Sequence, residues 1–393
     1  MKLAILTCGM LPIPAVQGGA VENLIDFYLE YNDTHKLHDI TVYSPWNEKL
    51  ANHPALASDV NHYIFIDVTS LKARIARKLR SLFHSNEYYN YFIEYYFERV
   101  YAILKKQHFD YIILENCDGY AYKLSQRGYK NLILHMHNER RTSRSMYDEI
   151  VYNNITKIVT VSNYIKKTVP SFISKDRIQT VYNGIDLKSF TSYNSKSAIY
   201  RKSIGLSDDD FVIVYNGRIN EEKGISELIE AMLLLKGYAK IKLLIIGGTF
   251  FGNAKNDNKF VRSLKEKIME IEDKCVFTGF IPYSQVPLYL RLADIAVLPS
   301  MWDEPFGLTI VEAMAADLPL ITTLSGGIPE ICEGVATIVN KDNIVNNLVS
   351  AILDLYNNPE KRKQMSATSI ERAKLFDKET YAKNFFAAIE SIS

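Results

Sequence analysis

The chain has 393 residues, of which 47% are hydrophobic and 23% charged, and its formal net charge is +1. This length is too great for one compact core and favours two domains, while the balanced charge excludes a global attraction to nucleic acid. No stretch approaches the roughly 20 apolar residues that span a bilayer. The four cysteines are scattered, without a CxxC pair or metal-ligand spacing, and we interpret them as reduced core thiols of a cytoplasmic protein.

The first half of the chain alternates apolar runs with helical patterns, which is typical of a parallel α/β sheet. Strands are expected at 3–7, 39–43, 63–67, 110–115, 131–136, 157–161 and 179–182. Gly18 and Gly19 precede the first expected helix, and two adjacent glycines let a ligand approach the backbone closely. The GxGxxG dinucleotide fingerprint is absent from this turn. His137 directly follows an expected strand, and the carboxyl ends of parallel strands face the ligand crevice.

A basic amphipathic helix is expected at residues 71–83. Its cations are Lys72, Arg74, Arg77, Lys78 and Arg80, and its apolar residues at helical spacing are Leu71, Ile75, Leu79, Leu82 and Phe83. Such a helix binds an anionic membrane surface or an acidic partner, or it is a solvated face of the protein. Both interpretations remain open at the level of sequence.

The second half repeats the α/β pattern. Strands are expected at 211–215, 242–246, 275–278, 294–299 and 320–323, and two final helices near 344–356 and 378–392. Arg218 and Lys223 lie on either side of the turn between the first of these strands and its helix. Cations in such a turn are well placed to bind phosphates, Arg as a bidentate fork and Lys as a point charge.

Residues 301–323 form the stretch with the most chemical information. A loop with Glu304 and Gly307 leads into an expected helix at 308–316, which carries Glu312. A helix N-terminus suits a phosphate, and carboxylates suit ligand hydroxyls. An ordinary βαβ crossover with two solvated glutamates fits the same spacing equally well.

Together, the cations, the helix N-terminus and the carboxylates favour an anionic ligand rich in hydroxyl groups, such as a nucleoside diphosphate sugar. We expect it to bind in a cleft between the two halves. No DxD-like carboxylate pair stands in a loop suited to a bridging divalent ion. The two cations are therefore expected to stabilise a departing diphosphate without a metal.

These motifs resemble those of glycosyltransferase family 4, the retaining enzymes of GT-B fold. The resemblance covers nearly the whole chain and is strongest from residue 216 to residue 330. It is carried by Gly18-Gly19, Val161-Ser162-Asn163, Asn183-Gly184-Ile185-Asp186, Gly217-Arg218, Glu222-Lys223-Gly224, Gly279-Phe280, Glu304 to Glu312 with Pro305-Phe306-Gly307 between them, and Gly326-Gly327-Ile328-Pro329-Glu330. Tyr182 replaces the usual Pro before Asn-Gly, which is expected to change turn rigidity only.

The resemblance implies an α/β protein of GT-B fold, with two Rossmann-like doubly wound domains that face each other across a deep cleft. The N-terminal domain, 1–185, is expected to bind the acceptor, and a C-terminal helix at 376–393 is expected to join it. The C-terminal domain, 186–375, is expected to bind the nucleotide sugar.

The resemblance also implies roles for the site residues. Glu304 and His137 are the candidate catalytic residues beside the transferred sugar, neither as a covalent catalyst, and Glu312 is expected to bind the ribose. The donor diphosphate is expected to contact Arg218, Lys223, Gly18, Gly19 and the backbone of Phe306, Gly307, Leu308 and Thr309. Phe280 and Ile281 are expected to frame the base. Whether His135 or His137 faces the cleft stays open, and we favour His137 because it lies nearer the strand end.

The implied activity is a retaining, metal-independent transfer of a hexose from a nucleotide diphosphate sugar, UDP before GDP, to a glycan or lipid-linked acceptor in cell-surface polysaccharide synthesis. No cofactor, metal or nucleic acid is expected. A peripheral contact of residues 71–83 with an anionic membrane at the inner face of the cell is one of the two interpretations left open for that helix. Two other classes remain: a non-catalytic GT-B partner subunit, and another enzyme of this architecture, a nucleotide-sugar epimerase or a phosphorylase. For the phosphorylase, no lysine has the context expected of a pyridoxal phosphate site.

Overall fold

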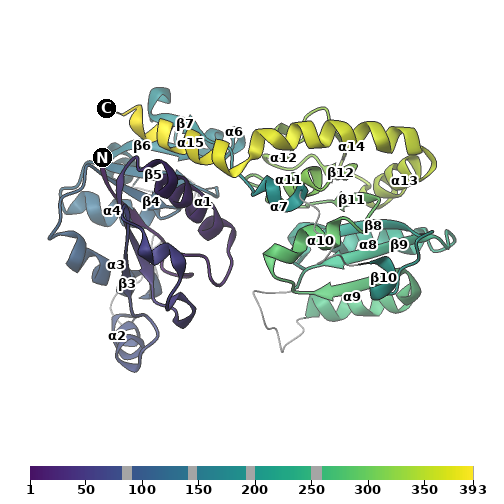
Figure 1. Ribbon diagram of the computed structural model, residues 1–393, viewed down its shortest axis with the longest axis horizontal. Helices are drawn as coiled ribbons and strands as arrows, with labels where there is room; N and C mark the ends of the chain where they lie inside the picture. The colour runs from purple at the N-terminus through teal and green to yellow at the C-terminus, as the bar shows by residue number, and fades with distance from the viewer. Residues whose placement is uncertain (82–90, 140–147, 192–199, 249–258, 393) are drawn as a thin grey trace. The chain divides into compact units, whose positions relative to one another are not determined.

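The computed structural model describes residues 1–81, 91–139, 148–191, 200–248 and 259–392. These residues form two compact units, Met1–Gly184 with Lys378–Ser393, and Ile185–Asp377. Each unit is a parallel β-sheet with helices packed against it (Figure 1). The expected fold class, two α/β halves with a Rossmann-like sheet in each, is confirmed.

The first unit is built on a seven-stranded sheet in the order β3-β2-β1-β4-β5-β6-β7, and every neighbouring pair is parallel. The strands are β1 (Lys2–Leu6), β2 (Asp39–Pro45), β3 (Asn61–Ile66), β4 (Tyr111–Glu115), β5 (Leu132–Met136), β6 (Ile155–Thr160) and β7 (Ile178–Thr180). All seven were expected from buried apolar runs. The strand order reverses between β1 and β4, the point at which open α/β sheets bind ligands.

The helices of the first unit include the one that was expected to carry a basic surface. They are α1 (Ala20–His35), α2 (Leu71–Ser81), α3 (Tyr91–Leu104), α4 (Asp118–Gln126), α5 (Asp148–Asn153) and α6 (Asn163–Thr168). Helix α2 confirms the helical prediction for its described residues, while Leu82 and Phe83 of the expected segment lie outside them. Helix α6 begins after Ser162, whose Oγ accepts a hydrogen bond of 3.1 Å from the N–H of Ile165.

Helix α15 (Lys378–Glu390) belongs to the first unit, although the whole second unit precedes it in the chain. It packs along α1 and reaches β6, as the yellow and purple ribbons of Figure 1 show. The Phe385 ring stacks on that of Tyr28 with centroids 4.4 Å apart, and Lys157 Nζ donates to Ser391 Oγ at 3.1 Å. This helix therefore completes the hydrophobic core on one face of the first sheet.

The second unit has a six-stranded parallel sheet in the order β10-β9-β8-β11-β12-β13. The strands are β8 (Phe211–Asn216), β9 (Ile241–Ile246), β10 (Cys275–Gly279), β11 (Ile295–Leu298), β12 (Leu320–Thr323) and β13 (Ala336–Val339). Five were expected. The sequence does not predict β13, because this short edge strand is only partly buried and lacks a long apolar run.

The helices of the second unit include several that the sequence analysis does not predict. The helices of this unit are α7 (Leu187–Thr191), α8 (Ile225–Leu234), α9 (Lys259–Met269), α10 (Val286–Leu290), α11 (Leu308–Ala315), α12 (Ile328–Ile331), α13 (Ile344–Asn357) and α14 (Pro359–Ala373). Those that the sequence analysis does not predict are α7, α9, α10 and α14. Helix α14 buries only Ser369 and Ala373, so no apolar stripe at helical spacing marks it. Apolar residues of β8, β9, α8 and α13 form the core of this unit.

Candidate functional site

The candidate residues of the second unit lie at the carboxyl ends of its strands. Asn216 is the last residue of β8, and Lys223 is the last residue of the 3-10 helix η6 (Glu221–Lys223) that follows. Glu304 lies in the loop between β11 and α11, and Glu312 lies on α11. Parallel strands end at one edge of the sheet, so residues separated by about 90 positions in sequence meet there.

Lys223 and Glu304 form an ion pair in which the ammonium group donates to Glu304 Oε1. Ser300 Oγ, at the end of β11, donates to the same oxygen at 2.9 Å. Glu304 is 8% exposed, so its carboxylate is held by two donors in a largely dry environment. The structure thus joins the residue expected to bind phosphate to the residue expected to bind sugar.

Two glycines allow the backbone around this ion pair to pack closely. Gly224 has a φ of +69°, and a Cβ atom there would lie 1.9 Å from the carbonyl oxygen of Pro299. Gly326 has a φ of +52°, and its Cβ would lie 2.3 Å from the carbonyl oxygen of Glu304. Both positions combine a left-handed conformation with a backbone contact that only glycine permits.

Glu312 is buried and accepts a hydrogen bond of 2.7 Å from Asn216 Nδ2 at its Oε2. Burial raises the pKa of Glu312 to about 7, although the contacts with Asn216 and with the Tyr283 hydroxyl oppose the shift. At neutral pH the carboxyl group is therefore close to half protonated. Its charge is then sensitive to a ligand whose hydroxyl groups donate hydrogen bonds to it.

The N-terminus of α11 lies between the two glutamates in sequence. Its N-cap, Gly307, has a φ of +100°, and Leu308 and Thr309 are partly exposed in the first turn. The first N–H groups of a helix have no partner within the helix and attract anions. The Phe306 ring is buried against Phe376, with centroids 5.7 Å apart, so only the backbone of Phe306 is available to a ligand.

Two further expected site residues are exposed after β8 and β10, the strands on either side of β9. The side chain of Arg218 is exposed two residues after β8, where its carbonyl oxygen accepts a hydrogen bond of 2.8 Å from the Tyr215 hydroxyl. Phe280 is exposed directly after β10, and Ile281 beside it is partly exposed. An exposed aromatic ring offers a face on which a planar base can stack.

In the first unit, the expected residues lie at the carboxyl ends of β1 and β5. Gly18 and Gly19 directly precede α1 with φ values of +74° and +114°, and a Cβ at Gly19 would lie 2.1 Å from Glu22 Oε2. Burial raises the pKa of Glu22 to about 6. His137 follows β5 and is 6% exposed, whereas His135 within β5 has no exposed surface.

Several polar residues of these sites have no role in the sequence-based prediction. They are Tyr28, Glu115, Asn216, Tyr283 and Ser300. Asn216, Glu115 and Ser300 end or follow apolar strands, and a polar residue in that position is a signal that sequence reasoning can use. Tyr28 on α1 and Tyr283 before α10 carry no such signal. Only the packing of distant segments brings Tyr28 to Glu115 and Tyr283 to Glu312.

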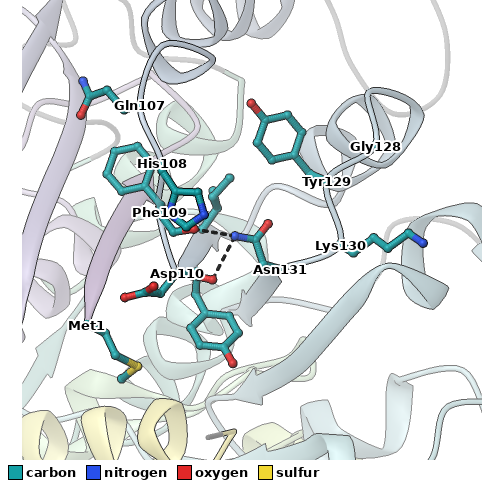
Figure 2. Close-up of a pocket in the computed structure, with 11 residues that line it drawn as sticks. Met1, Gln107, His108, Phe109, Asp110, Gly128, Tyr129, Lys130 and Asn131 are labelled. Carbon is teal, nitrogen blue, oxygen red and sulfur yellow. Dashed lines mark hydrogen bonds between the residues drawn. The ribbon is translucent and has the colours of Figure 1, made fainter.

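A hollow of about 740 Å³ opens at the other edge of the first sheet, around the amino ends of β4 and β5. Figure 2 shows Asn131 at its centre, donating 2.9 Å hydrogen bonds to the carbonyl oxygens of Phe109 and Asp110. The carboxylate of Asp110 accepts from the N–H of Lys2 at 2.6 Å. Its polar groups serve the fold, and it lies at the opposite strand ends from His137.

Among the residues that the structure describes, no helix combines the length and the apolar character needed to cross a membrane.

Comparison with known families matches both units. The family model "Glycosyl transferases group 1" matches residues 196–372, and "Glycosyltransferase Family 4" matches residues 34–189. The chain is similar to the protein YtcC of Bacillus subtilis (strain 168), with 29% identity over 386 residues, 95% of this chain and 83% of that protein. It is also similar to the lipopolysaccharide 1,2-N-acetylglucosaminetransferase of Salmonella typhimurium, with 26% identity over 230 residues, 57% of this chain and 58% of that enzyme.

Among solved structures, Anabaena Alr3699/HepE in complex with UDP has a similar fold. The TM-score is 0.75 at 18% sequence identity, and the alignment covers 100% of both chains. This likeness supports the GT-B fold that the sequence motifs imply.

Proposed function

This chain belongs to the glycosyltransferases, and from that premise we propose that it transfers a hexose from a nucleotide diphosphate sugar to a glycan or lipid-linked acceptor. The observation that carries the proposal is the arrangement of Lys223, Glu304, Glu312 and the N-terminus of α11 at one edge of the second sheet. The arrangement pairs cationic and N–H donors with two carboxylates, the complement of an anionic ligand with hydroxyl groups.

The donor binds through groups of separate chemistry. Lys223, Arg218 and the first N–H groups of α11 bind the diphosphate, and Glu312 accepts hydrogen bonds from the ribose hydroxyls. Phe280 and Ile281 pack against the base, and Glu304 contacts the sugar near its anomeric carbon. Gly18, Gly19 and His137 form a second candidate binding edge within the first unit, at the carboxyl ends of β1 and β5. A UDP sugar is favoured over a GDP sugar because the protein of similar fold, Alr3699/HepE, was solved with UDP.

The reaction retains the configuration of the anomeric carbon and needs no metal. The bond between the anomeric carbon and the diphosphate oxygen breaks, and the acceptor oxygen forms its bond on the same face of the sugar. The acceptor proton passes to the departing diphosphate oxygen. Lys223 and Arg218 stabilise the negative charge on the leaving group, the role that a divalent cation plays in other enzymes.

The acceptor is part of a cell-surface polysaccharide or glycolipid, and helix α2 brings the protein to an anionic membrane. Leu71, Ile75 and Leu79 form a stripe along α2 and are 72%, 52% and 57% exposed. The exposed cations Lys72, Arg74 and Lys78 flank this stripe. An apolar stripe with cations beside it is suited to the boundary between lipid headgroups and acyl chains. The similarity to a lipopolysaccharide-modifying enzyme supports the same class of acceptor.

The test is transfer from a panel of labelled UDP and GDP sugars to lipid and glycan fractions, in the presence and absence of EDTA. We expect transfer from a UDP hexose that persists in EDTA, with an anomeric configuration in the product, read by NMR, that matches the donor. Glu304→Gln is expected to abolish transfer. Turnover of the donor to an epimer without acceptor, or transfer that EDTA abolishes, contradicts the proposal.

A further inference from the structure

A buried cluster in the first unit joins one carboxylate to two imidazoles. Glu115 is the last residue of β4 and pairs across the parallel ladder with His135 of β5. His137 lies two residues further along, and residues two apart in a strand point to the same face of the sheet. Helices α1 and α15 cover that face through Tyr28 and Phe385.

The Glu115 carboxylate contacts three groups. Its Oε1 accepts a hydrogen bond of 2.9 Å from the Tyr28 hydroxyl. Its Oε2 lies 2.7 Å from Nε2 of His137 and 3.0 Å from Nδ1 of His135. Glu115 is buried, so bulk water does not compete for these contacts.

The three residues also carry metal-ligand atoms within 4.8 Å of one another. Two ligands at tetrahedral angles around zinc lie roughly 3.3 Å apart, given bonds of about 2.0 Å. The distances of 2.7 and 3.0 Å from Glu115 Oε2 to the two imidazoles are shorter than this, and the contact of 2.7 Å with His137 is a hydrogen bond. The geometry therefore favours a hydrogen-bonded pair of Glu115 and His137, with His135 beside it, over a metal site.

The charges of the cluster determine which atom carries the shared proton. Burial acts to raise the pKa of Glu115, but His135 and His137 outweigh it and hold that pKa well below its usual range. Burial and the neighbouring His135 lower the pKa of His137 to about 4. At neutral pH an ionised Glu115 faces a neutral His137, so the proton between them sits on Nε2 of the imidazole.

A neutral imidazole has one N–H donor and one bare acceptor nitrogen. Because Nε2 of His137 donates to Glu115, Nδ1 is the bare acceptor. This Nδ1 is buried and has no hydrogen-bond partner among the described residues. An unsatisfied acceptor in a dry site is unfavourable unless a ligand or an ordered water supplies a donor.

We propose that Glu115 is a positioning residue for His137, whose ring it holds with Nε2 protonated and Nδ1 as the acceptor for a hydroxyl group of the substrate. The identity of the substrate rests on the proposed function, whereas the tautomer does not. A carboxylate that orients a histidine in this way fixes both the ring plane and the nitrogen that meets the ligand.

The tautomer is measured without substrate, on the full chain labelled with ¹⁵N-histidine at pH 7. The His137 resonances are assigned by their loss in His137→Gln. We expect a protonated, pyrrole-like Nε2 and a pyridine-like Nδ1 in the native chain, and a mixture of tautomers in Glu115→Gln. Tyr28→Phe, which removes only the bond to the other carboxylate oxygen, is expected to keep the native pattern. A protonated Nδ1 in the native chain overturns the proposal even if Glu115→Gln does not fold.

Kinetics and metal content separate positioning from other roles. Glu115→Gln is expected to lower kcat/KM for the nucleotide sugar about tenfold, as loss of one hydrogen bond does, and to leave the Kd of free UDP unchanged. An equal loss of UDP affinity overturns the positioning role, and so does one equivalent of zinc in the native chain purified without chelator. If the native chain turns over no nucleotide sugar, the proposed function fails while the tautomer measurement still decides the role of Glu115.

Discussion

The ammonium group of Lys223 donates to the carboxylate of Glu304, and Ser300 donates to the same oxygen. The candidate phosphate-binding cation is thus neutralised by the candidate sugar-binding anion. If Lys223 binds a diphosphate as proposed, we expect the diphosphate to replace Glu304 as its partner and the released carboxylate to bind the sugar. Donor binding is therefore expected to be an exchange of ionic partners rather than the filling of an open cationic site.

Glu304→Gln is accordingly expected to bind free UDP more tightly than the native chain, even though it loses transfer. Removal of the competing carboxylate frees Lys223, and an ion pair of this partial exposure corresponds to a change of about fivefold. Titration calorimetry at fixed ionic strength measures the effect.

Asp303→Asn is the matched control for Glu304→Gln. Asp303 lies one residue earlier in the same loop, and its partner is Lys341 at 3.1 Å. This variant loses the same charge without freeing Lys223 and is expected to keep the native UDP affinity. Weaker UDP binding by Glu304→Gln, or equal tightening in both variants, contradicts the exchange.

Binding of a nucleotide sugar is expected to strengthen as pH rises from 6 to 8. Ribose hydroxyls donate to an ionised carboxylate, and the pKa of Glu312 is about 7 without ligand, so only part of the population is ionised below that pH. A nucleotide sugar is the probe because its diphosphate lacks the terminal ionisation, near pH 6, of a free phosphate monoester. Glu312→Gln is expected to bind weakly with a flat pH profile, and a native profile that is flat or falls with pH contradicts the role of Glu312.

The same group is expected to destabilise the fold at high pH. The pKa of Glu312 is raised from its ordinary 4.5 to about 7, so the folded state binds the proton more tightly than the unfolded state. The free energy of unfolding therefore falls as pH rises between these values. Glu312→Gln lacks this pH dependence. The difference in the free energy of unfolding between Glu312→Gln and the native chain should therefore shift by about 1–3 kcal/mol in favour of the variant between pH 5 and pH 8. Thermal unfolding of both proteins at pH 5 and pH 8 measures this shift. If the Tm of the variant differs from that of the native chain by the same amount at both pH values, the prediction is wrong.

Gly224→Ala is expected to lower the Tm much more than Gly205→Ala does. Both glycines follow short 3-10 helices in the left-handed region, with φ values of +69° and +82°. A Cβ at Gly205 meets open space, so that variant carries only the conformational cost of about 1–2 kcal/mol. The Cβ at Gly224 would overlap the Pro299 carbonyl and displace the segment that carries Lys223. Equal losses in the two variants would exclude this backbone contact as the reason for glycine.

Liposome binding is expected to depend on helix α2 and not on basic charge in general. Changing Lys72, Arg74 and Lys78 to Gln should weaken sedimentation with anionic liposomes, because each cation near the surface contributes about 1 kcal/mol. The control changes three exposed cations of α9, Lys259, Arg262 and Lys265, to Gln. The apolar face of α9 is buried in the core through Val261, Leu264 and Ile268. Equal effects of the two triple changes would remove the membrane role of α2.

Most of the fold is readable from the sequence, because buried parallel strands are apolar runs and the residues after them mark the ligand edge. The elements that the sequence analysis does not predict include β13 and α14, which lack a strong apolar signal, and α9, whose buried apolar residues at helical spacing were a usable signal. The two glutamates and Lys223 are also readable as site residues. Their pairing is not, because Lys223 and Glu304 meet only once β8 and β11 have formed their ladder. Glu115 and Tyr28 escape for the same reason, since 87 residues separate them.

The placement of α15 has a consequence for biosynthesis. Tyr28 and its neighbours on α1 emerge early from the ribosome, but the Phe385 ring that covers them follows only after the entire second unit. Residues 185–377 are contiguous and can close their own core first. The first unit is therefore expected to keep one apolar face uncovered until α15 has been synthesised, and exposed apolar surface of this kind is prone to aggregation.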